Sequence, residues 1–175
     1  RQITATNALN QTTSYWYDKN NRLLATTDAA GDTISKTYNN LGSQDSAADG
    51  LGNRTFYAYD GLGRLIQVTL PNGETTSYTY DNNGNVLTMT DAAGNVTTYE
   101  YNYMNLLIRL IRAGGRTGEP GSYTYDFSRI TSYTYTADGK VSTSTDRNGA
   151  VTVCVYDIHG NLLSRTVIEG AASQS

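Results

Sequence analysis

Residues 59–65 read Tyr59-Asp60-Gly61-Leu62-Gly63-Arg64-Leu65, and residues 80–86 follow the same pattern as Tyr80-Asp81-Asn82-Asn83-Gly84-Asn85-Val86. The two stretches begin twenty-one positions apart, and the same step connects further tyrosines. These are Tyr17, Tyr38, Tyr59, Tyr80 and Tyr101, and the step resumes from Tyr135 to Tyr156. A fixed period of this length is the signature of a repeat architecture, so the period decides the fold class.

Each repeat holds two turn signals. Glycine stands fourteen positions after a tyrosine, and glycine or asparagine stands four positions after it. These two residue types tolerate positive φ best, and a leading Asp accepts a hydrogen bond from the backbone ahead. We therefore predict hairpin corners that depend on Gly31, Gly52, Gly63, Gly73, Gly84, Gly94, Gly139, Gly149 and Gly160, with Gly115 and Gly170 continuing one column.

The segments between the corners are short and rich in Thr, Val, Leu and Tyr. We predict strands over 64–69, 74–80, 85–90 and 95–101. Because side chains alternate across a strand, Tyr78 and Tyr80 share a face with Thr76. The sequence predicts an all-β fold of tandem 21-residue β-hairpin repeats in a spiral or tube-like antiparallel sheet. The tyrosine column forms a ladder on one face, with Leu65, Leu87 or Leu163 between the rings.

The repeat runs through the whole chain, so we expect a single array over 1–175 that starts and ends inside a repeat. One interruption adds thirteen positions between Tyr101 and Tyr135. Residues 113–121 indicate an enlarged loop and residues 123–126 an extra strand, which together place an insertion around 113–128. Open sheet edges invite pairing with another chain.

Composition excludes several classes of protein. The chain has 175 residues, 38% apolar and 17% charged, with a net charge of −3 and fifteen tyrosines. No basic field is present to hold a nucleic-acid backbone. The longest apolar runs are a few residues, far below the roughly 18 that a membrane span requires.

Few residues qualify as candidates for chemistry. Cys154 reads as a small buried side chain, and His159, the single histidine, falls in a predicted turn. A column of acidic residues, Asp28, Asp49, Asp91 and Asp146, offers oxygen ligands for calcium, but each has a turn-capping role. We therefore expect no enzyme activity, no cofactor and no metal.

The motifs at 59–65 and 80–86 resemble the Rhs or tyrosine-aspartate (YD) repeat family, and the resemblance covers essentially the whole chain. Asn39 and Asn102 replace the Asp of the motif, and Thr136 replaces it at the sixth repeat. The resemblance implies large secreted or surface proteins, including bacterial toxins and teneurin adhesion receptors. In those proteins the repeats wind into a hollow shell that can enclose a toxic segment.

Three hypotheses for function remain open. In the first, the chain is a non-enzymatic scaffold, a segment of a secreted or cell-surface bacterial protein whose sheet walls an encapsulating shell. In the second, identical copies add through their sheet edges into an extracellular filament or tube. In the third, exposed tyrosines bind glycans in an adhesion module. The partners implied are further repeats of the same chain, identical copies, toxin cargo or a glycan, with no nucleic acid and no membrane span.

Overall fold

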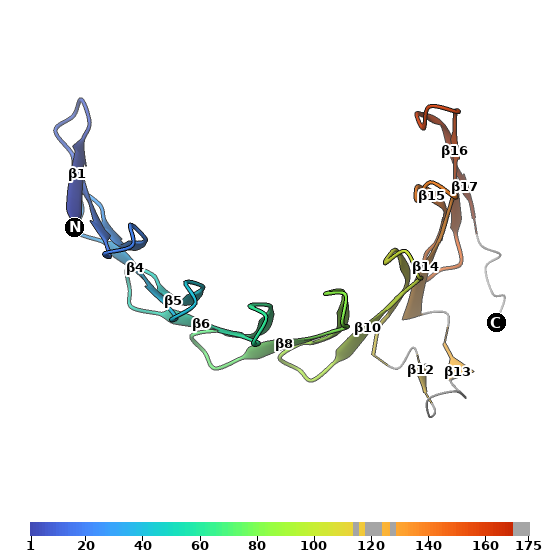
Figure 1. Ribbon diagram of the computed structural model, residues 1–175, viewed down its shortest axis with the longest axis horizontal. Coiled ribbons are helices and arrows are strands. Elements are labelled where there is room, and N and C mark those ends of the chain that lie inside the picture. Colours follow the sequence, from blue (N-terminus) through green and yellow to red (C-terminus); the bar gives the residue numbers. More distant parts are fainter. Residues whose placement is uncertain (114–115, 118–123, 127–128, 170–175) are drawn as a thin grey trace. The chain divides into compact units, whose positions relative to one another are not determined.

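The computed structural model describes residues 1–113, 116–117, 124–126 and 129–169, and every regular element of more than one residue in these ranges is a strand (Figure 1). The prediction of an all-β antiparallel fold is confirmed. The strands are β1 (Gln2–Thr6), β2 (Thr12–Tyr17), β3 (Leu23–Thr27), β4 (Thr33–Tyr38), β5 (Gln44–Ala48), β6 (Arg54–Tyr59), β7 (Leu65–Thr69), β8 (Thr75–Tyr80), β9 (Val86–Thr90), β10 (Val96–Tyr101), β11 (Leu107–Ile111), β12 (Arg116–Thr117), β13 (Thr124–Tyr125), β14 (Ile130–Tyr135), β15 (Val141–Thr145), β16 (Val151–Tyr156) and β17 (Leu162–Ile168).

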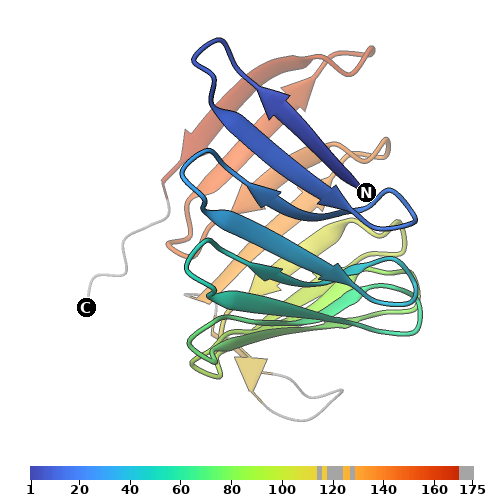
Figure 2. The ribbon, with the colours of Figure 1, turned by 90° about the vertical axis from the view of Figure 1, so that its left-hand side faces the viewer.

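The strands hydrogen-bond in chain order, from β1 to β11 and then from β14 to β17. β12 and β13 form a separate two-stranded sheet. The chain divides into two compact units, residues 1–77 and 78–175. Figure 2 shows the first hairpins of unit 1 lying side by side, as the pairing of β1 with β2 and of β2 with β3 requires.

Two kinds of strand pair alternate along the sheet. Where an even strand meets the odd strand after it, as β6 meets β7, the register shifts by one residue: Ala58 lies opposite Gln67, but Tyr59 lies opposite Leu65. Such a shift is a β-bulge. Where an odd strand meets the even strand after it, as β5 meets β6, the ladder has no shift. It has three residue pairs, except between β1 and β2, where it has five. The bulge therefore recurs with the period of the repeat.

The corners share one geometry, which the corner from Asp60 to Arg64 illustrates. The Gly63 N–H donates to the Asp60 carbonyl at 3.0 Å, and the Asp60 N–H donates to the Arg64 carbonyl at 2.9 Å. This is a type I turn followed by a residue in the left-handed region that forms a G1 bulge. Thirteen described residues have positive φ, three Asn and ten Gly, and they are Asn10, Asn21, Gly31, Gly42, Gly52, Gly63, Gly73, Gly84, Gly94, Asn105, Gly139, Gly149 and Gly160.

The corner geometry also explains a small displacement of the strands. β7, β8, β9 and β10 each begin one residue later than the ranges starting at 64, 74, 85 and 95 predict. The residue in question is the fifth of its corner, and its carbonyl accepts the hydrogen bond that closes the turn, as the Asn85 carbonyl does from the Asp81 N–H. It therefore belongs to the corner rather than to the ladder.

The predicted insertion is described only in part. Residues 116–117, inside the predicted loop, form β12, and β13 lies in the predicted extra strand. The Arg129 guanidinium donates to the Ala113 carbonyl at 2.8 Å, which ties the two ends of the insertion together. Gly115, Gly170 and most of 113–128 lie outside the described residues.

The sheet packs little of its surface away from solvent. Among described residues, those buried are Ser46, Ala48, Ile111 and Ile130. Ile111 and Ile130 lie opposite each other on β11 and β14, at the base of the insertion. Most other strand residues are half-buried. Cross-strand pairing within one layer, rather than a two-layer core, therefore supports this fold.

The corner geometry predicts different effects for two glycines of the same corner. Gly63 has φ of +80°, whereas Gly61 does not have positive φ, and a Cβ at either position meets no atom within 4 Å. Gly63→Ala should lower the free energy of unfolding by about 1–2 kcal/mol, the cost of left-handed backbone. Gly61→Ala should leave it unchanged or raise it by up to about 1 kcal/mol. Equal losses in urea denaturation of the two variants would contradict the turn assignment.

Candidate functional site

The candidate site is the repeated structure itself, and its first component is the side chain that opens each corner. In the corner at Asp60, Oδ1 accepts the N–H of Leu62 and the N–H of Arg64, both at 2.9 Å. Asn39 and Asn102 place an amide oxygen in the same position, with distances of 2.9–3.0 Å. The Asp-to-Asn departures in the repeat therefore keep the hydrogen bonds and lose only the charge.

These hydrogen bonds stabilise the charged form of the corner carboxylates. The backbone N–H of Arg64, followed by its side chain, lowers the pKa of Asp60 below the ordinary 3.8. For Asp81 the largest cause of the lowered pKa is the side-chain amide of Asn85. Bonds from the Lys140 and Thr136 side chains lower the pKa of Asp138 to about 2. Donors to a carboxylate favour its ionised form, which gives the direction of all three shifts.

The second component is the tyrosine column, and each of its members is the last residue of an even strand. All seven, Tyr17, Tyr38, Tyr59, Tyr80, Tyr101, Tyr135 and Tyr156, are half-buried. The register places Tyr17, Tyr38 and Tyr59 on one face of unit 1. It likewise places Tyr101, Tyr135 and Tyr156 on one face of unit 2. We call this the tyrosine face of each unit. The opposite side is the threonine face, with Thr37 in unit 1 and with Thr79, Thr88, Thr134 and Thr143 in unit 2.

The tyrosine hydroxyls hydrogen-bond to the backbone of the neighbouring strand. Tyr38 donates to the carbonyl of Leu23 at 2.9 Å, and Leu23 is the first residue of β3. That carbonyl lies two residues beyond Ala25, where the three-pair ladder between β3 and β4 ends. The same bond joins Tyr59 to Gln44, Tyr135 to Leu107 and Tyr156 to Val141, at 2.8, 2.6 and 3.0 Å. In these four strand pairs the phenol therefore extends the short ladder by one hydrogen bond.

Burial also changes the titration of the tyrosine face. Loss of water raises the pKa of Tyr135 above its ordinary 10.0, and the charge of Tyr133 raises it further. Burial, followed by the charges of Tyr99 and Asp81, raises the pKa of Tyr101 as well. The neutral phenol is the form that donates the backbone hydrogen bond, so folding and protonation favour each other.

A third component, which the sequence analysis missed, is a column of cations over the tyrosine rings. The Arg22 guanidinium lies 4.6 Å from the centroid of the Tyr38 ring, while its Nε contacts Asp18 Oδ2 at 2.7 Å. Arg1 lies 5.6 Å from the Tyr17 ring and Lys140 lies 5.8 Å from the Tyr156 ring. In all three pairs the cation precedes its tyrosine by sixteen positions, a spacing that is visible in the sequence.

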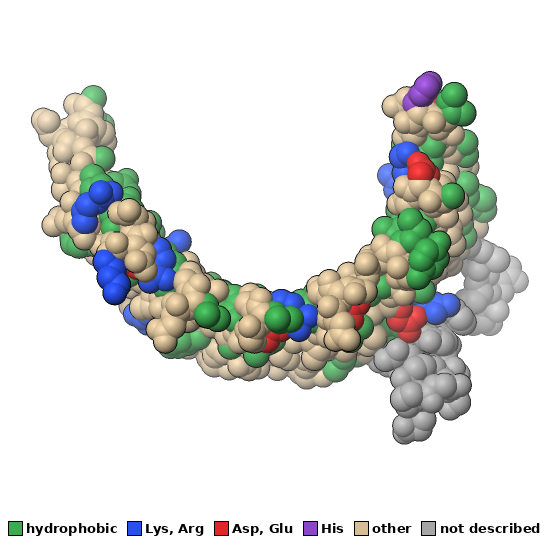
Figure 3. All heavy atoms as spheres, viewed as in Figure 1, with side chains coloured by type: hydrophobic (Ala, Val, Ile, Leu, Met, Phe, Trp, Pro, Cys, Tyr) green, Lys and Arg blue, Asp and Glu red, His purple; other side chains and the backbone are tan. Residues whose placement is uncertain are grey.

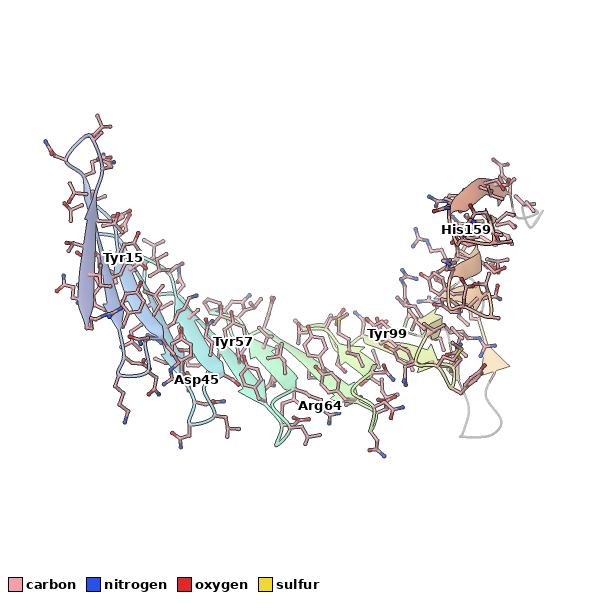
Figure 4. All side chains as sticks on the ribbon, turned by 45° about the horizontal axis from the view of Figure 1, so that its top comes forward. Tyr15, Asp45, Tyr57, Arg64, Tyr99 and His159 are labelled. Atoms are coloured by element: carbon pink, nitrogen blue, oxygen red, sulfur yellow. The ribbon has the colours of Figure 1, made fainter. Side chains whose placement is uncertain are left out.

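Arg64 occupies the same place in its repeat and pairs with Asp60 at 2.6 Å (Figure 4). Neighbouring corners in unit 2 are joined by asparagines: Asn105 Oδ1 accepts from Asn83 Nδ2 at 2.9 Å and from Asn85 Nδ2 at 2.8 Å. Polar contacts therefore connect one repeat with the next at the corners as well as within the ladders.

The residues singled out for chemistry do not converge. His159 is exposed at the corner between β16 and β17 (Figure 3), and Cys154 lies on β16 as a free thiol. Asp28, Asp49, Asp91 and Asp146 each open a different corner, where Oδ1 accepts two backbone N–H groups. Within the described ranges no group of three or more His, Cys, Asp or Glu is placed to hold a metal ion.

The repeat matches a known family model. The model described as RHS Repeat matches residues 59–96 and again residues 80–117. The start of the second match is displaced from the start of the first by one full period of the tyrosine column. Residues 59–117 therefore match Rhs repeats. No curated protein sequence matches it.

The fold of the chain is similar to parts of much larger solved structures. The crystal structure of TcdB2-TccC3-Cdc42 matches with a TM-score of 0.71 and 16% identity, over 93% of this chain and 9% of that chain. The crystal structure of TcdB2-TccC3 without its hypervariable C-terminal region matches with a TM-score of 0.72 and 15% identity, over 93% of this chain and 9% of that chain. The Tc holotoxin pore of Photorhabdus luminescens, with the mutation D651A in TccC3, matches with a TM-score of 0.70 and 16% identity. This match covers 93% of this chain and 9% of that chain. The chain therefore spans about a tenth of the length of the chains it matches.

The part of the chain that the structure describes contains no helix with the length and hydrophobicity needed to cross a membrane.

The hydroxyl bonds predict a difference between two tyrosines on β14. Tyr135→Phe removes the bond to the Leu107 carbonyl and should lower the free energy of unfolding by about 0.5–1.5 kcal/mol. Tyr133→Phe is the matched control, because the Tyr133 hydroxyl makes no hydrogen bond to another described residue. Chemical denaturation of both variants measures the difference, and equal losses would contradict the ladder extension.

The corner carboxylates predict a loss of stability in acid. Because the folded-state pKa of Asp60, Asp81 and Asp91 lies below the unfolded-state value, their stabilisation is present above pH 3.8 and is lost as the pH falls through the folded-state pKa. The melting temperature, followed by circular dichroism, should fall as the pH drops from about 4 to 2. A variant with all three changed to Asn, the residue that opens the corners at Asn39 and Asn102, should lose less over this range. An equal loss in both proteins would show that other groups control the acid sensitivity.

Proposed function

We propose that the chain is a non-enzymatic wall segment of a larger Rhs-type protein, in which its sheet forms part of a spiral shell around a toxic cargo. One observation carries the proposal: 93% of the chain has the fold of about a tenth of the TcdB2-TccC3 chains, and TccC3 is by name part of a Tc holotoxin. A secreted or cell-surface bacterial location follows from the same proposal.

The chemistry of the described residues supports a structural role. The corner carboxylates accept hydrogen bonds from backbone N–H groups, and phenols of the tyrosine face donate hydrogen bonds to backbone carbonyls. Both kinds of side chain therefore act on the backbone of their own sheet. In an enzyme we would look for a nucleophile, a base and an oxyanion donor that converge on one point.

The edges of the sheet supply the joints to further repeats. Among the described strands β1 pairs only with β2 and β17 only with β16, and every residue of both edge strands is exposed. An edge strand presents unpaired N–H and C=O groups to an incoming strand. We propose that further repeats of the same polypeptide occupy these edges. Identical copies that join there into a filament are the alternative.

The isolated chain distinguishes the wall segment from the filament. As a wall segment it should form monomers or irregular aggregates, which light scattering and negative-stain electron microscopy detect. Long regular fibres that grow with protein concentration would overturn the proposal in favour of the filament.

A double variant tests whether the edges cause any association. Ile3 and Val167 are 42% and 59% exposed on β1 and β17, so Ile3→Lys with Val167→Lys adds charge to both edges. Association should decrease while the circular dichroism spectrum stays the same. Undiminished association would mean that another surface, such as the tyrosine face, is responsible.

A further inference from the structure

One groove lies on the threonine face of unit 1, across β4 to β7. Its volume is about 610 Å³, which falls in the range of small-molecule sites. Asp45 on β5, labelled in Figure 4, is one of its lining residues. The side chains that give the groove its chemistry are Thr37, Asp45, Ser46, Arg54, Phe56 and Gln67.

The groove lies where one repeat departs from the rest. At the position of Arg54 and at the position of Phe56, the other six repeats carry only small or aliphatic side chains. These are Thr12, Thr33, Thr75, Val96, Ile130 and Val151 for the first position, and Ser14, Ser35, Ser77, Thr98, Ser132 and Val153 for the second. Eight of these twelve are Ser or Thr. Arg54 and Phe56 therefore place a cation and an aromatic ring where the repeat elsewhere supplies short side chains.

The floor of the groove is a chain of polar side chains joined by hydrogen bonds. Ser46 is 3% exposed, and its hydroxyl accepts from an Arg54 guanidinium nitrogen at 2.6 Å. The Thr37 and Ser46 hydroxyls are 2.6 Å apart, and the Thr37 hydroxyl donates to the Asp45 carboxylate. Because each hydroxyl has one hydrogen, Ser46 donates to Thr37. The direction of the chain is thus fixed, from Arg54 through Ser46 and Thr37 to Asp45.

This chain leaves hydrogen-bonding groups of both kinds at the groove. A guanidinium has five N–H donors and a carboxylate has two acceptor oxygens, and the floor uses one donor of Arg54 and one oxygen of Asp45. Gln67 adds an amide to the lining. The positive and negative charges balance, so a neutral ligand suits the site better than a charged one.

The apolar wall of the groove is the ring of Phe56. This residue is 51% exposed on β6, between Ser46 on one side and Thr69 on the other in the ladders. Both neighbours across the strands are small, so one side of the ring stays open to a planar apolar partner. A ligand for this groove needs an apolar face to cover Phe56 and hydroxyls that both donate and accept at its rim.

We propose that this groove binds a neutral saccharide. A pyranose has an apolar face of C–H groups that stacks on Phe56. Its neighbouring hydroxyls donate to Asp45 and accept from Arg54. The inference concerns the threonine face and Phe56, whereas the glycan hypothesis from sequence placed the sugar on exposed tyrosines. It does not depend on the proposed wall function.

Binding of the intact chain to an array of neutral gluco-, galacto-, manno- and N-acetylglucosamine oligosaccharides tests the proposal. Isothermal titration calorimetry with the strongest oligosaccharide then gives a dissociation constant. We expect saturable binding to at least one of these sugars. An array without signal, or binding only to acidic or basic peptides spotted beside the sugars, would overturn the proposal.

Two variants locate the binding to the groove. Phe56→Ser introduces the residue that other repeats carry at this position, and Asp45→Asn keeps the side-chain shape while removing the charge. Each should weaken binding by at least about tenfold. Val155→Ser is the matched control, because Val155 is a 48% exposed residue on the threonine face of β16. Unchanged affinity in both groove variants, with melting temperatures that show both folded, would place the sugar elsewhere.

Discussion

The five-residue corner is the constraint on which the rest of the structure depends. Its fourth residue must have positive φ, which is why Gly63, Gly84 or Asn105 stands there. In most corners the first residue offers a side-chain oxygen to two backbone N–H groups, as Asp60 does. Leu70 has no such oxygen, and there Asn72 accepts the N–H of Glu74 instead. Thr136 uses its hydroxyl for the N–H of Lys140. The chemistry of the corner is therefore more constant than its residues.

With the corners fixed, the stability of a single-layer sheet depends on how completely its ladders are bonded. A ladder of three residue pairs is short, and the bulge on the other side of each odd strand shifts the register by one residue. The phenol of the tyrosine column bonds to the carbonyl just beyond the ladder, and a cation covers the ring at Tyr38. Tyrosine therefore contributes a hydrogen bond and apolar area at the same place, which Phe or Leu does not provide.

The sequence predicts the strands and corners well, because a fixed period with glycine at two constant offsets admits few other folds. It does not predict which carbonyl each tyrosine reaches, since that depends on where the ladder with the preceding strand ends. Likewise Phe56 and Ser46 are ten residues apart in the sequence, and the register of β5 with β6 makes them direct neighbours. The column of cations over the tyrosine rings could have been predicted from the sequence, because Arg22 precedes Tyr38 and Lys140 precedes Tyr156 by the same sixteen positions.

The insertion shows which part of the repeat carries the structure. β11 and β14 are joined by the insertion rather than by a corner, yet they form the same three-pair ladder as β9 and β10. The hydroxyl bond persists as well. Tyr135 donates to the carbonyl of Leu107, 28 residues earlier, whereas Tyr156 donates to the carbonyl of Val141, 15 residues earlier. These two sequence separations differ by thirteen residues, the length of the insertion. A strand pair with its tyrosine is therefore the constant unit of this sheet, and the connection between the strands can change without altering it.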